Sequence, residues 1–331
     1  MVGVAQLVEP RVVISAVVGS SPIVHPIFRL VRQVFTAVAL MLLVGGGAGA
    51  AERVPTLFIA GDSTAAKYTG PNPQQGWGEY LGEFFDPRKL LVSNAALGGR
   101  SSRTFVTEGH WDRMLADVRP GDFVIIQFGH NDAGGINEEP PGSTRPLRAR
   151  GTLQGTGNES QEIDNVVTGK HETVYSFGWY LRKMIADTRE KGATPILLSL
   201  TATNNWKDGR IGCPAAYRTW TWQTAVAEKV AFVDLLRIIG ERYQREGQEK
   251  VTAQFGSDTT HTNGAGAQAN AADVVAGLRG VETLTLDEKL SARGKQIKPD
   301  RGPRNPRSAT SPGSNARFQG LPAPARPHSF S

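Results

Sequence analysis

The sequence predicts an α/β protein whose main domain is a three-layer α/β/α sandwich around a central parallel sheet. Two features of the chain lead to this fold class. Short apolar runs rich in β-forming residues recur along it, and segments with helical spacing separate them. Runs as uniformly apolar as these suit strands that are buried on both faces. Alternation of strand and helix implies parallel strands joined by right-handed helical crossovers.

The order of elements follows from these runs. The expected strands are 56–60, 90–93, 122–128, 194–200 and 231–234. Helical spacing is found in 77–85, 174–191, 217–228, 235–246 and 264–278. The segment 134–173 interrupts the alternation, because it is long, polar and rich in Gly, Pro and Arg. Loops longer than about 15 residues are usually functional or mobile, so we expect a substrate-facing flap, and a plain disordered insertion is the alternative.

The beginning of the chain has the layout of a secretory signal. An apolar run, 34–44, follows two arginines and precedes small residues that end at Ala50. The run has about half of the ~20 apolar residues that a membrane-spanning helix needs. We therefore expect 1–51 to be a signal peptide, cleaved near Ala50 or Ala51, or an N-terminal anchor with its leader. The protein is then expected to be secreted or periplasmic, and a misassigned start codon is a further alternative.

The end of the chain, 291–331, is rich in Pro, Arg, Ser and Gly, which predicts a disordered tail. It carries eight Lys or Arg and one Asp, so the formal charge of +6 of the whole chain belongs to the tail. Basic stripes interleaved with aromatic residues are absent from the rest, which argues against a nucleic-acid partner. We expect a solvated tail, with a weak polyanion tether as the alternative.

The remaining 52–290 is long enough for one well-buried domain. Cys213 is the only cysteine in it and in the chain, so no intramolecular disulfide can form and a cysteine-based metal cluster is excluded. A packed, inert thiol is expected.

Polar residues follow three of the expected strands at their carboxyl ends, where sites form in parallel sheets. Ser63 comes directly after the first strand, a placement that a nucleophile needs, although Asp62 or Ser63 could equally cap a helix. After the second strand, Gly99 can approach a ligand closely and offer its N–H to an oxyanion. After the third, the side chain of Asn131 offers another donor, although this residue type also favours turns. We expect the neighbouring His130 to be structural.

A fourth polar motif lies near the end of the domain, just before a helical segment. Asp258 precedes His261 by three residues. At this spacing the carboxylate can hydrogen-bond the imidazole and fix its tautomer, which leaves the other ring nitrogen free to take a serine proton. The alternative is that Asp258 or Thr262 caps the following helix.

The four motifs Gly-Asp-Ser, Gly-Gly-Arg-Ser, Gly-His-Asn-Asp and Asp-x-x-His appear in the order that SGNH (GDSL-like) hydrolases show, and the chain resembles that superfamily throughout about 55–280. The stretches NAALGGRSSRTF, QFGHNDAGG and DTTHTNGAGA are most similar to the rhamnogalacturonan acetylesterase group. The resemblance implies a flavodoxin-like sheet. One departure is the stretch SLTATNNWKDGRIGCP, where the resemblance implies a proline-containing turn, so the leaving-group side of the pocket departs from the family pattern.

Carried over by position, the resemblance implies Ser63 as the nucleophile, with Asp258 and His261 as its partners. The backbone N–H groups of Ser63 and Gly99 and the side chain of Asn131 would form the oxyanion hole. Such a mechanism requires no metal and no organic cofactor.

The substrate is expected to be an acetylated, anionic pectin, because cations are concentrated near the proposed site and Arg suits bidentate carboxylate binding. The candidate substrate-binding residues are Arg103, Arg148, Arg150 and Lys170, with Trp206 as a sugar-stacking platform. Arg100 belongs to the same group but is the likeliest of these to be structural. Alternatives are acetylxylan, peptidoglycan O-acetyl groups, a lipid ester, or a non-catalytic carbohydrate-binding protein of the same fold. The sequence does not predict an oligomeric state.

Overall fold

A computed structural model describes residues 53–69, 74–138, 147–212 and 215–302. The fold below belongs to one compact unit, Val54–Ser331. The expected signal segment, Cys213 and the last part of the expected tail lie outside the described residues. Within the described ranges, none of the helices combines the length and the apolar composition that crossing a membrane requires.

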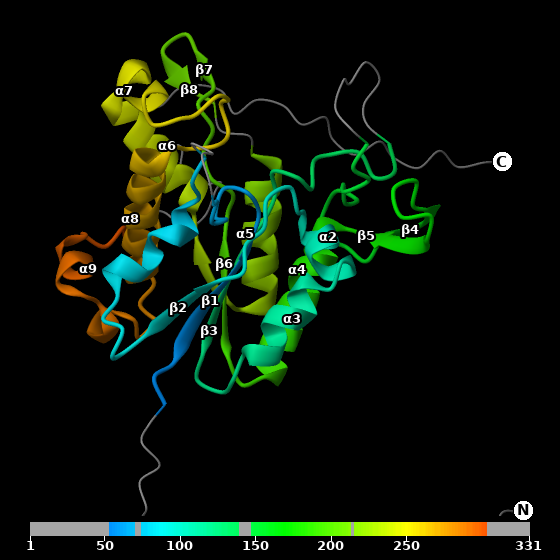
Figure 1. Ribbon diagram of the computed structural model, residues 1–331, viewed down its shortest axis with the longest axis horizontal. Helices are drawn as coiled ribbons and strands as arrows, with labels where there is room; N and C mark the ends of the chain where they lie inside the picture. Colours follow the sequence, from blue (N-terminus) through cyan, green and yellow to red (C-terminus); the bar gives the residue numbers. More distant parts are fainter. Residues whose placement is uncertain (1–52, 70–73, 139–146, 213–214, 303–331) are drawn as a thin grey trace, which may run out of the picture. The chain divides into compact units, whose positions relative to one another are not determined.

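The central sheet has five parallel strands in the order β2-β1-β3-β6-β9 (Figure 1), as the alternation of strand and helix predicts. Its strands are β1 (Thr56–Gly61), β2 (Leu91–Asn94), β3 (Phe123–Gln127), β6 (Thr194–Leu198) and β9 (Ala231–Val233). The chain enters the sheet at β1, moves to the edge strand β2 and then returns past β1 to β3, β6 and β9. This reversal of strand order is the topological switch point, beside which ligands bind in doubly wound sheets.

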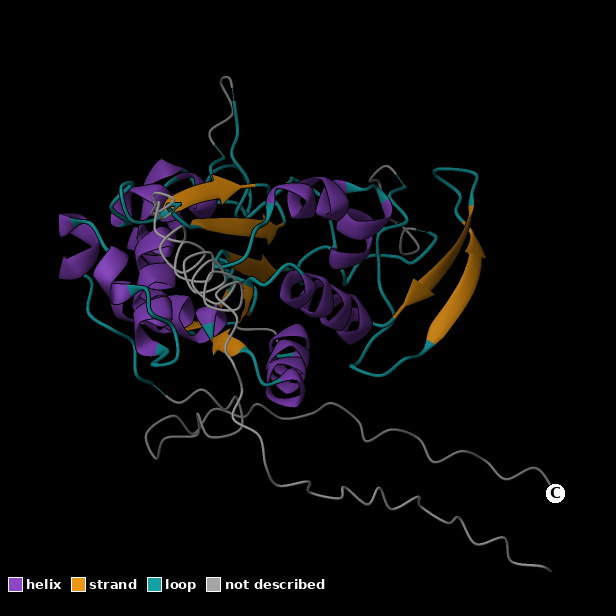
Figure 2. Ribbon diagram, turned by 90° about the horizontal axis from the view of Figure 1, so that it is seen from below, coloured by secondary structure: helices purple, strands orange, loops and turns teal. Residues whose placement is uncertain are grey.

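Helices cover both faces of the sheet, which confirms the three-layer sandwich (Figures 1 and 2). Successive side chains of β1 enter opposite layers, Leu57 and Ile59 on one face and Phe58 and Ala60 on the other. The first layer contains α6 (Leu235–Glu246), α8 (Gly264–Gly280) and the 3₁₀ helices η1 (Trp77–Glu79) and η2 (Leu81–Phe84). The second contains α2 (Ser102–Thr107), α3 (His110–Asp117), α4 (Phe177–Glu190) and α5 (Ala216–Glu228).

The described part of the segment 134–173 is ordered rather than structureless. It contains strand β4 (Ser160–Asp164), which pairs with β5 (His171–Tyr175) in an antiparallel hairpin that stands apart from the central sheet (Figure 2). This pairing also corrects the expected helix at 174–191. Because Tyr175 still belongs to β5 and Ser176 caps the helix by accepting from the N–H of Trp179, α4 begins only at Phe177.

Several short elements were not expected from the sequence. Helices α2 and α3 fill the connection between β2 and β3, and the expected helix at 77–85 is split into η1 and η2. The other short elements are β7 (Trp206–Lys207), β8 (Arg210–Ile211), α7 (Gln248–Thr252), η3 (Asp287–Lys289) and α9 (Ala292–Gln296).

The ordered fold extends to 302, beyond the boundary at 290 that composition suggested, so the first part of the expected disordered tail is packed. Ser291 caps α9, and Gly294 within it is buried. The N–H of Asp300 donates to the carbonyl of Ala276 at 2.8 Å, and its carboxylate pairs with Arg237. Backbone hydrogen bonds and one buried arginine hold this segment although it offers few aliphatic side chains.

Candidate active site

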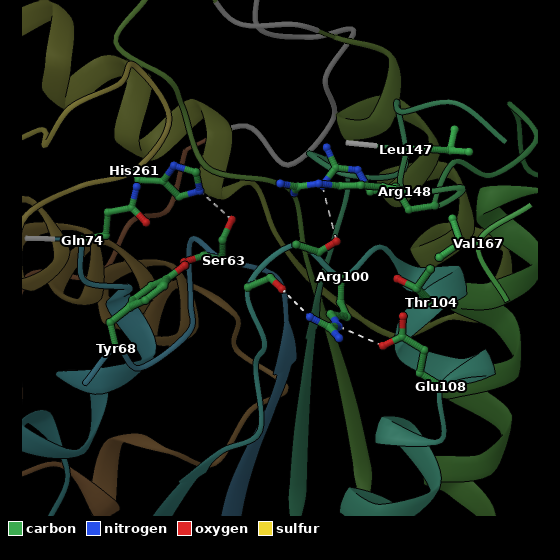
Figure 3. Close-up of a pocket in the computed structure, with 13 residues that line it drawn as sticks. Ser63, Tyr68, Gln74, Arg100, Thr104, Glu108, Leu147, Arg148, Val167 and His261 are labelled. Carbon is green, nitrogen blue, oxygen red and sulfur yellow. Dashed lines mark hydrogen bonds and ion pairs between the residues drawn. The ribbon is translucent and has the colours of Figure 1, made fainter. Parts of the chain in front are cut away.

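The structure brings Ser63, His261 and Asp258 into one chain of hydrogen bonds, of which Figure 3 shows the contact between His261 and Ser63. The imidazole Nε2 of His261 lies 2.8 Å from the hydroxyl of Ser63, and Nδ1 lies 2.7 Å from Oδ2 of Asp258. In this arrangement the carboxylate holds the proton on Nδ1, so that Nε2 is available to accept the serine proton.

Ser63 lies in the turn that follows β1. Asp62 shapes this turn, because its carboxylate accepts from the N–H of Thr64 at 2.9 Å and from the hydroxyl of Thr64 at 2.7 Å. Its carbonyl accepts from the N–H groups of Ala65 and Ala66. Asp62 thus stabilises a turn, since the described residues up to Thr69 form no helix for Asp62 or Ser63 to cap. The hydroxyl of Ser63 lies within hydrogen-bond distance of His261.

The loop before α8 is held in place by main-chain hydrogen bonds. The N–H of Gly256 donates to the carbonyl of His261 at 3.1 Å, and the N–H of Gln75 donates to the carbonyl of Thr262 at 2.8 Å. Asn263 caps α8 by accepting from Ala265 and Gly266. Neither Asp258 nor Thr262 is therefore the cap.

Asp258 is partly exposed, and its other oxygen, Oδ1, accepts from the N–H groups of Thr260 at 2.7 Å and of His261 at 2.8 Å. Partial burial acts to raise the pKa of this carboxyl. The hydrogen bonds from the His261 side chain and from the two N–H groups outweigh it, so the pKa lies below its ordinary value. The carboxyl is therefore ionised at neutral pH.

Gly99 and Asn131 are the two other donors that the sequence predicts for the oxyanion hole. Gly99 lines the same pocket as Ser63 and has a φ of +77°, which favours glycine. Asn131 is buried, and its Nδ2 donates to the carbonyl of Arg100 at 2.9 Å, which orients the amide and leaves its second hydrogen available. Among the described residues, no acceptor is found for the N–H of Ser63 or of Gly99.

Asp132 connects the two elements that carry these donors. Its Oδ1 accepts from the N–H of Ser102 at 3.0 Å and from the hydroxyl of the same residue, so the end of β3 is tied to the start of α2. Burial raises the pKa of Asp132 to about 7, and the hydrogen bonds from Ser102 only partly offset that effect.

Ser63, His261 and Gly99 border an open pocket of about 610 Å³, whereas Asn131, Asp132 and Asp258 are not among the described lining residues. Figure 3 shows Ser63 and His261 pointing toward each other, with Arg148 on the other side of the pocket in this view. The described residues that line it are Ser63, Tyr68, Gln74, Gly98, Gly99, Arg100, Thr104, Glu108, Leu147, Arg148, Arg150, Val167 and His261. Among the described residues, no group of three or more His, Cys, Asp or Glu side chains could hold a metal ion.

Comparison with known proteins identifies the family. Residues 59–269 match the GDSL-like Lipase/Acylhydrolase family. A rhamnogalacturonan acetylesterase from Emericella nidulans is 32% identical over 64% of this chain and 79% of its own length. A probable rhamnogalacturonan acetylesterase from Bacillus subtilis, YesY, is 32% identical over 67% of this chain and 92% of its own length.

This chain belongs to the GDSL-like lipase/acylhydrolase family. It is a carboxylic ester hydrolase, as its motifs predict. The crystal structure of the Bacillus subtilis protein YxiM agrees with the fold, with a TM-score of 0.53 at 25% identity. The match covers 68% of this chain and 56% of the YxiM chain.

Two of the arginines expected to bind substrate, Arg148 and Arg150, line the pocket of this GDSL-like hydrolase. The prediction for Arg103 was wrong. Its side chain is fully buried, and it forms a bidentate pair with Glu172, at 2.7 and 2.9 Å. It also donates to the carbonyls of Ile136 and Gly151. Arg103 therefore fastens the flap segment to α2 and does not reach the substrate.

The other two candidates, Lys170 and Trp206, do not belong to the pocket lining. Lys170 lies in the turn of the β4–β5 hairpin and is exposed. Trp206 packs against the core, and its Nε1 donates to the Asn204 side chain at 2.8 Å. His130 is largely buried, its Nε2 lies 3.0 Å from the hydroxyl of Thr201, and burial lowers its pKa.

Sequence reasoning missed Tyr68 and Glu108. Tyr68 donates to the carbonyl of Ser63 at 3.2 Å and borders the pocket. Its position five residues after Ser63, in the same exit loop of β1, could have indicated it. Glu108 follows α2 and pairs with Arg100 at 2.9 Å, and no local signal in the sequence distinguishes it from other surface acids.

Proposed function

We propose that this hydrolase is a serine carbohydrate esterase that removes acetyl groups from acetylated pectin through an acetyl-serine intermediate. The observation that carries the proposal is the hydrogen-bonded chain of Ser63, His261 and Asp258 at the rim of an open pocket. A serine hydroxyl paired with a base, itself oriented by a third group, is the arrangement of an activated nucleophile.

In the first half of the reaction, Ser63 Oγ attacks the acetyl carbonyl while His261 Nε2 takes its proton. The tetrahedral oxyanion accepts from the N–H groups of Ser63 and Gly99 and from the free Nδ2 hydrogen of Asn131. Asp258, ionised at neutral pH, stabilises the imidazolium that forms. Collapse of the intermediate expels the sugar hydroxyl, which takes its proton from His261.

In the second half, water enters the site and His261 removes its proton. The resulting hydroxide attacks the acetyl group on Ser63, the same donors hold the oxyanion, and acetate leaves as the serine regains its proton. Every step uses side chains or N–H groups of this chain together with water.

The pectin substrate is supported by two observations. Two relatives are named rhamnogalacturonan acetylesterase or probable rhamnogalacturonan acetylesterase, and the match to this chain covers most of the length of each. The pocket lining also contains three arginines and one carboxylate, an excess of positive charge that suits an anionic polymer better than a neutral one. The open shape of the pocket suits a segment of a chain rather than an enclosed small molecule.

The test is acetate release from acetylated rhamnogalacturonan and, in parallel, from acetylated xylan, using the full chain and its Ser63→Ala variant. We expect faster release from the pectic polymer and loss of release in the variant. Equal or faster release from xylan would keep the serine esterase and overturn the pectin substrate. Release that Ser63→Ala leaves unchanged would overturn the mechanism.

We also propose that the protein is secreted or periplasmic, on the basis of the apolar run at 34–44. Expression of the full chain in a bacterial host, followed by N-terminal sequencing of the exported protein, tests this. A new N-terminus near Ala50 or Ala51 is expected. An uncleaved chain that remains in the membrane fraction would support the anchor instead.

A further inference from the structure

Arg148 lies beside the glycine proposed for the oxyanion hole. A Cβ atom placed on Gly99 would lie 3.6 Å from Nη1 of Arg148, so the guanidinium is in van der Waals reach of that backbone. The residue is exposed and lines the pocket together with Ser63. Within the described ranges, no hydrogen bond or ion pair of its guanidinium is found.

The neighbouring charges are engaged elsewhere. Glu108 is the one carboxylate among the described residues of the pocket lining, and its Oε2 lies 2.9 Å from Nε of Arg100 and 2.9 Å from Nε2 of His110. Arg150 reaches the carbonyl of Gly99 at 3.5 Å. Arg148 is thus the arginine of the lining whose donors face the pocket without a described acceptor.

We propose that Arg148 forms a carboxylate subsite. Through this subsite the enzyme selects acetylated pectin with free galacturonate carboxylates over its methyl-esterified form. The proposal rests on the proposed function, since it concerns the same pocket and polymer. A guanidinium binds a carboxylate through two parallel charge-assisted hydrogen bonds. A methyl ester carries no charge, and its methyl group blocks one oxygen, so it cannot make this pair.

This preference gives the enzyme a place in a reaction sequence. On a methyl-esterified polymer, hydrolysis of the uronate methyl ester, in which water and the ester give a carboxylate, a proton and methanol, supplies the preferred substrate. The carboxylate then occupies the Arg148 subsite while a nearby acetyl group reaches Ser63. Acetyl removal by this enzyme is therefore faster after methyl-ester hydrolysis.

The experiment compares two preparations of acetylated rhamnogalacturonan with equal acetyl content, one with free carboxylates and one whose carboxylates are methyl-esterified. The kcat/KM for acetate release is measured with the full chain, Arg148→Gln and Arg148→Lys, and 4-nitrophenyl acetate serves as a small neutral substrate. We expect the unmodified enzyme to prefer the free acid by about five- to tenfold, the range for a charge-assisted pair in a solvent-open pocket.

Arg148→Gln should abolish this preference, because the rate on the free acid should fall more than the rate on the methyl ester. The loss on the free acid should likewise exceed any change in the turnover of 4-nitrophenyl acetate, which carries no carboxylate for Arg148 to bind. Arg148→Lys should keep part of the preference, because the charge remains but the paired geometry is lost.

The matched control is Arg301→Gln, which removes the same charge from an exposed position. Arg301 follows Asp300, whose N–H binds Ala276 near the end of α8, whereas His261 lies just before the start of that helix. A helix of this length separates its ends by about 25 Å. The control should keep the preference of the unmodified enzyme.

Equal rates on the two polymers, or a preference that persists in Arg148→Gln, would overturn the subsite and leave the proposed function standing. Loss of the preference in both Arg148→Gln and Arg301→Gln would mean that the preference depends only on the net charge of the protein. This result would also overturn the subsite. Turnover of 4-nitrophenyl acetate without acetate release from either polymer would overturn the pectin substrate itself and the subsite with it.

Discussion

The Nε2 atom of His261 lies 2.8 Å from the hydroxyl of Ser63, although 198 positions separate the two residues along the chain. Ser63 is placed by the turn after the central strand β1, and His261 by the loop before α8. Because that loop is hydrogen-bonded to Gln75, which follows the serine turn, the two segments support each other. The proposed chemistry depends on this contact and on the groups that orient it.

Asp258→Asn tests the orientation of the histidine. An amide in place of Oδ2 would present its NH₂ group to Nδ1 of His261, which would favour the wrong tautomer, while the amide oxygen could still accept from the backbone N–H groups. We expect kcat for acetyl ester hydrolysis to fall roughly 10²- to 10⁴-fold with a small change in KM. Steady-state kinetics measure this, and an unchanged kcat would show that Asp258 does not assist His261.

Asn131→Ala tests the oxyanion hole. The variant removes a side-chain donor that the carbonyl of Arg100 holds in place, so transition-state stabilisation should be lost and kcat should fall about 10²- to 10³-fold. Asn158→Ala, an exposed asparagine whose side chain contacts Arg182, is the matched control and should keep full kcat. Similar values for both variants would remove Asn131 from the oxyanion hole.

Arg103→Met tests the role of the buried ion pair. The substitution leaves Glu172 without its bidentate partner and two carbonyls without donors, so we expect the free energy of unfolding to fall by about 3–5 kcal/mol. Urea denaturation measures the loss. Arg88→Met, which removes an exposed pair with Asp86, should leave the unfolding midpoint unchanged. A stable Arg103→Met protein with a raised KM would instead restore the substrate-binding role first expected for Arg103.

The pH dependence of stability tests the buried Asp132. Its pKa is about 7 in the folded protein against an ordinary value of 3.8, so between these pH values the folded state binds more protons than the unfolded state. The contribution of Asp132 to stability therefore decreases as pH rises from about 4 to about 7. Asp132→Asn should abolish this decrease and gain stability relative to the unmodified protein as pH rises.

The contribution of His130 to stability changes with pH in the opposite direction over part of that range. Burial lowers its pKa, so it stabilises the folded state above its ordinary value of 6.5 and loses that contribution as pH falls. The difference between the unmodified protein and Asp132→Asn, measured by urea unfolding at about pH 5 and about pH 8, isolates the carboxyl because both proteins contain His130. A difference that does not change with pH would mean that Asp132 is ionised throughout.

The sequence alone determined the central sheet and the residues of the proposed triad. Strands that are buried on both faces have uniformly apolar sequences. All five strands could therefore be predicted from short stretches of sequence, and β1, β3 and β6 lie where these stretches predict. Parallel topology then places every strand's carboxyl end at one edge of the sheet. That rule predicts Ser63, Gly99 and Asn131 at one edge of the sheet, and the late Asp-x-x-His motif supplied the predicted partners of Ser63.

Only the tertiary structure decided the roles of the arginines and the extent of the domain. Arg103 and Arg148 are the same residue type in similarly polar surroundings along the chain, yet one is fully buried against Glu172 and the other faces the pocket. The segment 291–302 looks disordered by composition, but hydrogen bonds to residues far away in sequence order it. Burial and pairing of polar groups depend on partners brought by distant segments, and a local pattern of residues does not specify them.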